Sequence, residues 1–181
     1  DTPQSFGFTG TGMLAEVQDN GIDGGHPDLS GVIYRDGSVV VDHHGTCTSG
    51  IVFGNGAGDM QAFGIVPDAE GAFSDWSTGR AFSVANPWNG DFNVLSSSLN
   101  GIVQSNSWSQ GTCDGLYQLY AEENDQAMVD YPHVLTLWAS ANSNDGTDEG
   151  RISEDSAAKN VMCIGAIFHQ DTATLADDQY E

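Results

Sequence analysis

Asp19 and His44 are the two side chains whose surroundings in the sequence best suit acid–base chemistry. Asp19 follows an apolar run at residues 13–17 and precedes Asn-Gly, a strong turn signal, so we expect it at the carboxyl end of a short buried strand. His44 precedes Gly-Thr and opens a stretch of small residues. A buried carboxylate that fixes the tautomer of an imidazole makes that histidine a general base for a serine hydroxyl. Asp before histidine is also one of the chain orders of Ser-His-Asp hydrolases.

Three segments around these two residues follow a known pattern. Residues 19–23 (Asp-Asn-Gly-Ile-Asp) and 26–29 (His-Pro-Asp-Leu) resemble the Asp-x-Gly-Ile-Asp and His-Pro-Asp-Leu segments of the subtilases. Residues 44–51 (His-Gly-Thr-Cys-Thr-Ser-Gly-Ile) resemble that family's His-Gly-Thr-His-Val-Ala-Gly-Ile. The resemblance implies that Asp19 is the acid that orients the general base His44 in a serine endopeptidase.

The resemblance extends to the group that would stabilise the negative charge formed during acyl transfer. Residues 139–142 read Ala-Ser-Ala-Asn and resemble the family's Ala-Ala-Gly-Asn, which implies that Asn142 donates a hydrogen bond to the oxyanion. One such donor contributes roughly 3 to 4 kcal/mol of transition-state stabilisation. Ala141 stands where the family has glycine, and its methyl group restricts the backbone angles open to this loop.

A substrate-binding segment is implied at Ser107, Trp108 and Ser109, which resemble a family segment that reads Ser-Leu-Gly or Ser-Trp-Gly. In the family this segment lines the pocket for the residue before the scissile bond, and extended peptides pair with an exposed strand through their backbones. The expected substrate is therefore a protein or a peptide. Read without the family, Trp108 is a core residue.

The family's nucleophile segment, Gly-Thr-Ser-Met-Ala, does not occur in these 181 residues. The four Gly-Thr pairs are followed by Gly12, Cys47, Cys113 and Asp148 instead of serine. In the family the reactive serine lies well after a strand segment that residues 158–166 resemble. We therefore expect the serine to lie outside this chain, the chain to be inactive alone, and the remaining carboxyl-terminal part of the same domain to be its partner.

Two other interpretations stay open. The first is a catalytically inactive subtilase-like domain that binds a peptide or protein, which the departures at Cys47, Ser109 and Ala141 mildly favour. The second is an acidic structural domain that would gain stability on binding calcium. The presence of both Asp19 and His44 argues for the enzyme, because a binding domain does not need that pair.

The composition of the chain restricts the classes of partner that it can bind. The 4 Lys and Arg against 26 Asp and Glu give a formal net charge of -22, and such a surface repels nucleic acid. We expect no membrane partner, because no apolar run approaches the roughly 18 residues that a spanning helix needs. The chemistry requires no cofactor, although residues 145–149 could supply oxygen ligands to structural calcium. The resemblance alone implies a secreted or extracytoplasmic protein. Sequence leaves the disulfide state of Cys47, Cys113 and Cys163 open.

The order of the elements predicts an α/β fold. Short apolar runs typical of strands alternate with longer helical patterns. The strand patterns occupy residues 13–17, 32–34, 71–74, 102–105 and 133–139, and the helical patterns occupy residues 91–100 and 116–131. Residues 44–54 are poor in helix formers, and the resemblance implies a buried helix there and a further strand at residues 158–166. In the last helix we expect Glu122, Glu123 and Asp125 to face outward. Together with the resemblance, this predicts a three-layer subtilisin-like domain over residues 1–181, with a mostly parallel central sheet and an incomplete carboxyl-terminal side.

Overall fold

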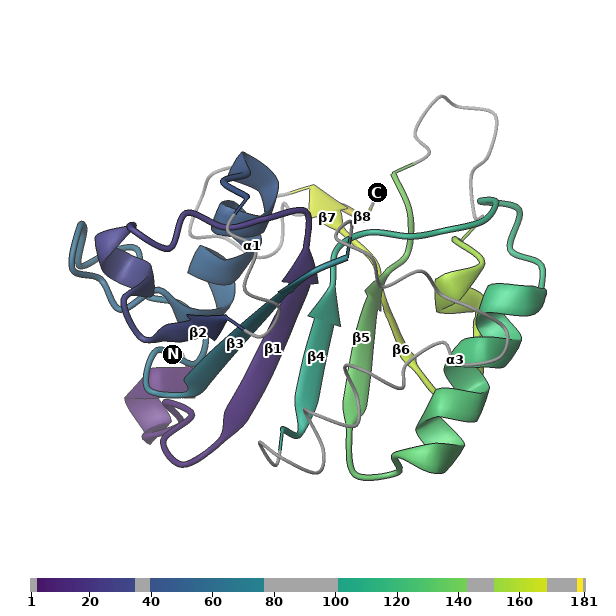
Figure 1. The fold of residues 1–181 in the computed structure, drawn as a ribbon, viewed down its shortest axis with the longest axis horizontal. Helices are drawn as coiled ribbons and strands as arrows, with labels where there is room; N and C mark the ends of the chain where they lie inside the picture. The colour runs from purple at the N-terminus through teal and green to yellow at the C-terminus, as the bar shows by residue number, and fades with distance from the viewer. Residues whose placement is uncertain (1–2, 35–39, 77–100, 143–151, 169–178, 181) are drawn as a thin grey trace.

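The computed structural model describes residues 3–34, 40–76, 101–142, 152–168 and 179–180. Their centre is a six-stranded parallel sheet with the strand order β2-β3-β1-β4-β5-β6 (Figure 1). The strands are β1 (Leu14–Asp19), β2 (Val32–Tyr34), β3 (Glu70–Asp75), β4 (Val103–Asn106), β5 (Leu135–Ala139) and β6 (Met162–Ile164). Because all six are parallel, their carboxyl ends meet along one edge of the sheet, where α/β proteins collect ligands and chemistry.

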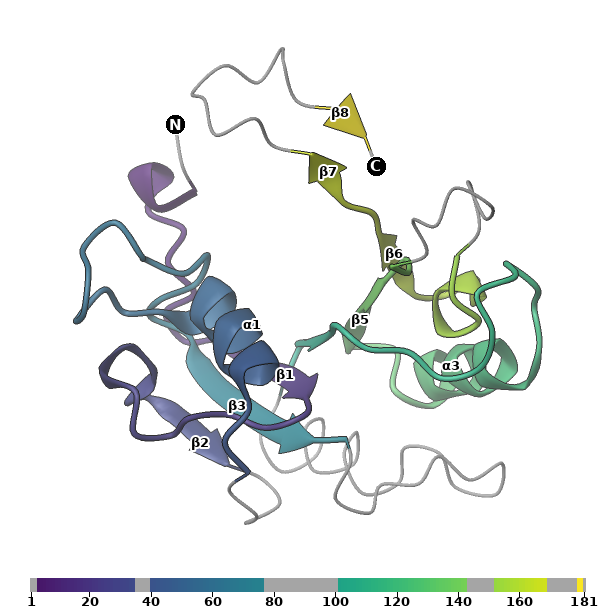
Figure 2. The same cartoon turned by 90° about the horizontal axis from the view of Figure 1, so that it is seen from above.

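Two helices lie on opposite faces of this sheet (Figure 2). α1 (His43–Phe53) lies over β1 and β3, and α3 (Leu119–Asp130) lies on the other side, near β5. The predicted α/β architecture with helices on both faces of a parallel sheet is confirmed. The shorter elements are the 3-10 helices η1 (Pro3–Phe6), η2 (Pro27–Leu29) and η4 (Asp155–Ala157), and the antiparallel pair β7 (Ile167–Phe168) and β8 (Gln179–Tyr180).

The alternation of side chains along the strands divides the core into two clusters. On the side of α1, Val17 and Phe73 pack with Phe53 of the helix. On the side of α3, Leu14 and Trp138 belong to one buried cluster with Met128 and other residues. Both faces of β1 are thus covered, and all six of its residues are buried. Its last residue, Asp19, therefore sits at the end of a rigid, fully packed strand.

The helix expected at residues 116–131 is shorter in the structure, and a different face of it is buried. α3 begins at Leu119, whose side chain is exposed, whereas Glu123 is only 6% exposed. The expectation that Glu123 faces outward is therefore wrong. The reason is tertiary, because η4 packs against α3 and places Glu154 and Asp155 near this part of the helix. A periodic pattern in one helix does not reveal which segment covers it.

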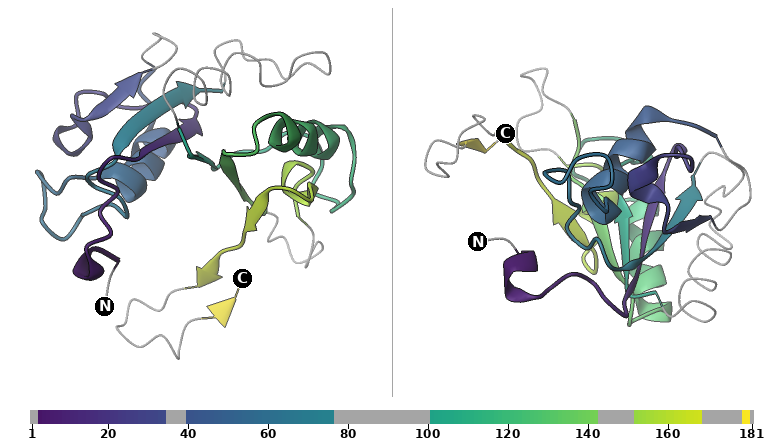
Figure 3. Two further views of the ribbon diagram at one scale, coloured as in Figure 1. Left: turned by 90° about the horizontal axis from the view of Figure 1, so that it is seen from below. Right: turned by 90° about the vertical axis from the view of Figure 1, so that its left-hand side faces the viewer.

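One half of the sheet is covered on one side only. On β5, Thr136 Oγ1 lies 3.4 Å from Met128 Sδ of α3, and Trp138 packs in the same cluster as Met128. The alternation of a strand then turns Leu135 and Leu137 to the opposite side, the side of α1. No helix of the described residues lies over β5 and β6 on that side, as Figures 2 and 3 show.

The uncovered surface is apolar. Met162 of β6 is in register with Leu137, so it faces the same way, and Ile164 lies two residues further on. Leu135, Met162 and Ile164 are 41%, 48% and 44% exposed. We call Leu135, Leu137, Met162 and Ile164 the open half-face. Parallel sheets are normally buried on both faces, so this surface is suited to being covered by a further segment.

Two expectations from sequence fall on parts of the chain outside the described residues. These are the helix at residues 91–100 and the acidic loop at residues 145–149. In the part of the chain that the structure describes, no helix has the length and apolar character needed to span a membrane.

Candidate active site

Asp19 and His44 meet at the carboxyl edge of the sheet. His44 Nδ1 lies 2.7 Å from Asp19 Oδ1, although the two residues are far apart in the chain. An ionised carboxylate can only accept a hydrogen bond, so the ring donates from Nδ1 and its Nε2 is left as the basic nitrogen. Asp19 is 1% exposed and the His44 side chain is 53% exposed. A buried carboxylate thus holds an imidazole whose other side is open to solvent.

The start of α1 fixes where His44 lies. Asp42 is the N-cap of the helix, and its side chain accepts a hydrogen bond from the His44 N–H at 2.8 Å. Gly45 follows, and a Cβ at this position would lie 1.9 Å from Gly21 O and 3.1 Å from Asp19 Cβ. Only glycine lets the first turn of α1 come this close to the end of β1. Glycine therefore follows His44 because only glycine allows the close approach of α1 to β1 that brings the His44 imidazole to the Asp19 carboxylate.

Both oxygens of the Asp19 carboxylate accept hydrogen bonds. Besides the His44 ring, Oδ1 accepts from the Asn20 N–H at 2.8 Å, and Oδ2 accepts from Thr48 Oγ1 at 2.9 Å. These partners compensate for the loss of water around a buried charge. The sequence analysis did not single out Thr48. Its signal was available, since a hydroxyl four residues after His44 on a helix lies on the same face as the ring.

The proposed substrate-binding segment is anchored by a row of tryptophan rings. Trp108 stacks on Trp76 with 5.4 Å between ring centroids, and its edge contact with Trp138 has 5.0 Å between centroids. Trp76 also donates from Nε1 to Asn20 Oδ1, beside Asp19. The Trp108 ring is thus packed against the core, which is the role predicted for Trp108 when the family resemblance is set aside. Ser107, Ser109 and the backbone between them are the parts of the segment left for contact with a peptide.

Asn142 lies exposed, three residues beyond the end of β5. The backbone just before it is held from two sides, because the Ser140 N–H donates to Ile164 O at 2.9 Å and Ser140 O accepts from Ser156 Oγ at 3.2 Å. β1 and β5 are separated by β4 alone, so the strand spacing places their ends about 10 Å apart. Asn142 therefore shares the sheet edge of Asp19 and His44, on the far side of β4.

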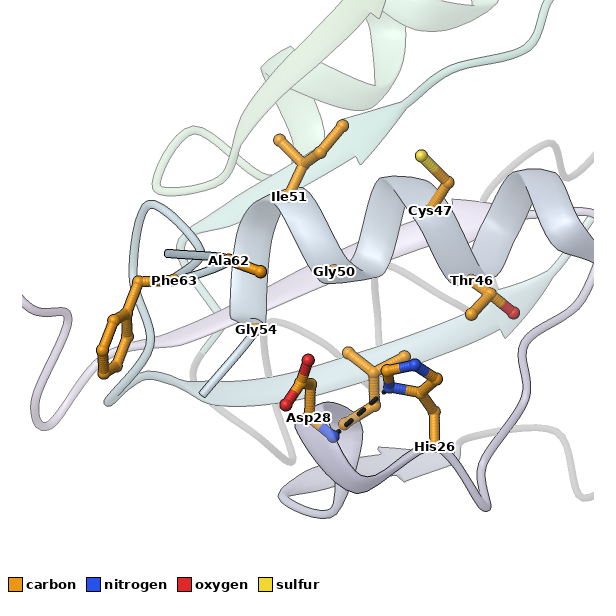
Figure 4. A pocket seen from close by; sticks show the side chains of 10 residues that line it. His26, Asp28, Thr46, Cys47, Gly50, Ile51, Gly54, Ala62 and Phe63 are labelled. Carbon is orange, nitrogen blue, oxygen red and sulfur yellow. Dashed lines mark hydrogen bonds between the residues drawn. The ribbon is translucent and has the colours of Figure 1, made fainter. Parts of the chain in front are cut away.

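A pocket of about 340 Å³ lies on the other side of α1 from the sheet edge just described, between that helix and η2 (Figure 4). His26 and Asp28 line it, but neither Asp19 nor His44 does. His26 Nδ1 accepts from the Asp28 N–H at 3.3 Å, and Asp28 Oδ1 accepts from the Gly58 N–H at 2.6 Å. Both side chains thus hold turns of the backbone. In Figure 4 the Cys47 and His26 side chains point apart, so they form no thiol–imidazole pair.

Three carboxyl groups are buried together behind the substrate-binding segment. Asp155 Oδ2 accepts from the Gln110 N–H at 2.6 Å, and Glu154 Oε1 accepts from the Tyr120 N–H in the first turn of α3 at 2.8 Å. Burial raises the pKa of Asp155 to about 7, and the charge of Glu154 adds to the rise. Burial, and after it the Glu154 charge, also raises the pKa of Glu123. Through these hydrogen bonds, Asp155 and Glu154 connect the chain after Ser109 to α3 and η4.

The raised pKa of Asp155 predicts a pH-dependent stability. The folded state keeps a proton that the unfolded state releases, so stability is highest below the ordinary pKa of 3.8 and falls until the pH passes about 7. Asp155→Asn should remove this loss, which we expect to be on the order of 2 to 4 kcal/mol between pH 4 and pH 8. Urea unfolding at several pH values measures it. Asp130→Asn, at an exposed position at the end of α3, is the control and should keep the wild-type slope. An unchanged slope in Asp155→Asn would contradict this assignment.

Neither a disulfide nor a metal centre is found among the described residues. Cys47, Cys113 and Cys163 all lie in the described residues, and all three are free thiols. Among the described residues, no group of three or more His, Cys, Asp or Glu side chains is arranged to hold a metal ion.

With this geometry in place, the chain can be compared with known proteins. A model of the subtilase family matches residues 10–177. The chain belongs to the subtilase family. The predicted family and the predicted subtilisin-like fold are both confirmed.

Solved structures of other subtilisin-like proteases share the fold of this subtilase. The prenylagaramide maturation protease PagA is 20% identical, with a TM-score of 0.64 over 86% of this chain and 54% of its own. The self-cleaved protease domain of PatA is 18% identical, with a TM-score of 0.65 over 95% of this chain and 63% of its own. The CspB protease of Clostridium perfringens is 17% identical, with a TM-score of 0.55 over 79% of this chain and 38% of its own.

The comparison also bears on how much of a protease domain this subtilase chain represents. It spans between 54% and 63% of the lengths of PagA and the PatA domain. The described parts contain the Asp19–His44 pair, residues 107–109 and Asn142, all at the same sheet edge. The sequence assigned each of these positions, and the structure brings Asp19 and His44 into direct contact.

Proposed function

We propose that this subtilase domain is a serine endopeptidase that hydrolyses peptide bonds through an Asp-His-Ser triad, with Asp19 and His44 in this chain and the serine outside its 181 residues. The observation that carries the proposal is the 2.7 Å contact between His44 Nδ1 and the buried Asp19 carboxylate. A half-exposed imidazole with one nitrogen held by a buried carboxylate has the arrangement that a serine nucleophile needs.

The roles follow from which atoms are held and which are free. The serine hydroxyl would attack the peptide carbonyl while His44 Nε2 takes its proton, and Asp19 would stabilise the resulting imidazolium. The Asn142 side-chain amide would donate to the oxygen that becomes negative. His44 would then give the proton to the leaving amine, and a water molecule would repeat the sequence to release the acyl group. No step requires a cofactor.

The open half-face supports a nucleophile supplied by a further segment of the same domain. Its exposed residues are Leu135, Met162 and Ile164, and the other side of β5 already packs against α3 through Trp138 and Met128. Parallel sheets are covered on both faces in stable domains. The chain also matches little more than half of the lengths of its structural relatives. We propose that the additional segment covers this half-face and carries the serine to His44.

The substrate, location and metal content are further proposals. A protein or peptide substrate fits the extended segment at Ser107, Trp108 and Ser109, next to the catalytic pair. Secretion and structural calcium rest on family membership, and residues 145–149, proposed as a source of calcium ligands, lie outside the described residues. Addition and removal of calcium during thermal unfolding tests the calcium proposal, because a ligand that binds only the folded state raises the melting temperature further as its free concentration increases above Kd.

Peptide hydrolysis by two forms of the protein tests the proposed activity. We expect the protein in its full natural length to hydrolyse a peptide substrate in a reaction that a serine-directed phosphonate blocks. We expect the 181-residue chain alone to show no phosphonate-sensitive turnover. Turnover by the short chain would show that the nucleophile lies within it. A full-length protein that binds peptides without ever cleaving them would favour the catalytically inactive binding domain instead.

A further inference from the structure

The Asp19 carboxylate has a second side-chain partner that the motif around His44 does not require. Thr48 Oγ1 lies 2.9 Å from Asp19 Oδ2, the oxygen that does not contact the His44 ring. Asp19 is almost completely buried, so water does not solvate the carboxylate freely. The orientation of its carboxylate plane is therefore set by the protein groups that donate to it.

The helix presents Thr48 and His44 together. They are four residues apart on α1 (His43–Phe53), so their side chains lie on one face of the helix and reach one carboxylate from the same side. The backbone N–H of Asn20 contacts Oδ1, the oxygen already held by the ring. Thr48 is the side chain that holds Oδ2, and two points of attachment on different oxygens fix the plane of the carboxylate.

The Thr48 hydroxyl has one proton and two acceptors within reach. The Gly45 carbonyl oxygen lies 3.1 Å away, in the manner of a threonine that bonds back to its own helix. The Asp19 contact is shorter and its acceptor carries a charge, which makes a stronger hydrogen bond. The balance favours donation to Asp19. In the subtilase pattern quoted above, this position is a valine, whose similar shape offers no donor.

We propose that Thr48 is a positioning residue, whose hydroxyl holds the Asp19 carboxylate in the plane that directs Oδ1 at His44 Nδ1. Its consequence for turnover rests on the proposed function, because it acts through the imidazole. The ring orientation itself does not depend on where the nucleophile lies. Thr48 is not a catalytic residue, since it touches neither the substrate nor the base.

Two substitutions at one position test this role in the protein of full natural length. Thr48→Val keeps the shape and removes the donor, and Thr48→Ser keeps the donor and removes the methyl group. In proton NMR, the strongly downfield signal of the His44 Nδ1–H should broaden or disappear in Thr48→Val and persist in Thr48→Ser. Turnover should show kcat lowered about tenfold in Thr48→Val with KM unchanged, and kcat within about twofold of wild type in Thr48→Ser.

The outcomes separate this proposal from the proposed function. A retained Nδ1–H signal and unchanged kcat in Thr48→Val would overturn the role of Thr48 and assign the hydroxyl to Gly45 O. Equal losses in Thr48→Val and Thr48→Ser would also overturn it, because they would trace the effect to packing. Absence of wild-type turnover would defeat the proposed function, whereas the NMR comparison would still decide whether Thr48 orients the pair.

Discussion

His44→Ala is expected to lower kcat of the full-length protein about 10⁶-fold, the loss known for the triad histidine of subtilisin. The imidazole is the group that removes the proton from serine and later protonates the leaving amine, and no other described side chain contacts the Asp19 carboxylate as a base would. The side chain is 53% exposed, so little packing is lost and the folded state should keep its stability. Steady-state kinetics and thermal unfolding measure both effects.

The adjacent histidine provides a matched control. His43 is the first residue of α1 and is exposed. His43→Ala should therefore leave kcat within about twofold of wild type, as surface substitutions generally do. Comparable losses in His43→Ala and His44→Ala would show that the motif was assigned wrongly, or that any change at the start of α1 disturbs the site.

Asp19→Asn is expected to lower kcat about 10⁴-fold, the effect of the corresponding change in Ser-His-Asp enzymes. The reason is tautomeric, because the asparagine amide offers a donor where His44 Nδ1–H, Thr48 and the Asn20 N–H all need an acceptor. The His44 ring is then free to carry its proton on Nε2. A protonated Nε2 cannot accept the proton of the serine hydroxyl. Loss of the downfield Nδ1–H signal should accompany the loss of kcat.

Asp23→Asn is the control for this change, since it alters a carboxylate in the same segment. Asp23 Oδ1 accepts from the Gly25 N–H at 2.9 Å, and an asparagine oxygen can accept the same bond. Near-wild-type kcat is expected. An Asp19→Asn protein with full activity would show that the contact with His44 does not take part in the chemistry.

The sequence predicts those parts of the site that depend on local order along the chain. Asp19 could be placed because a strand that ends at Asn-Gly puts its last side chain at the sheet edge. His44 could be placed because it directly precedes Gly-Thr in a segment that resembles the subtilase pattern. The structure adds the physical reason for Gly45, since a Cβ there would lie 1.9 Å from Gly21 O. Both assignments use information within a few residues of the side chain.

Features that depend on packing between distant segments were beyond the reach of the sequence. Glu123 was expected outside because a charged residue on a helix normally faces water, but η4 covers it and brings two more carboxyl groups. The spacing of Thr48 from His44 could place both side chains on one face of a helix, but the contact of Thr48 with Asp19 joins two elements and is seen only in the fold. The stacking of Trp108 on Trp76 likewise joins two segments whose proximity only the folded sheet reveals.

The most direct measurement is mass-spectrometric mapping of the residue that a serine-directed phosphonate modifies in the protein of full natural length. We expect one adduct, on a serine outside residues 1–181, that forms in wild type and is strongly reduced in His44→Ala and Asp19→Asn. No adduct in the wild-type protein, or an adduct that forms equally fast in both variants, would contradict it.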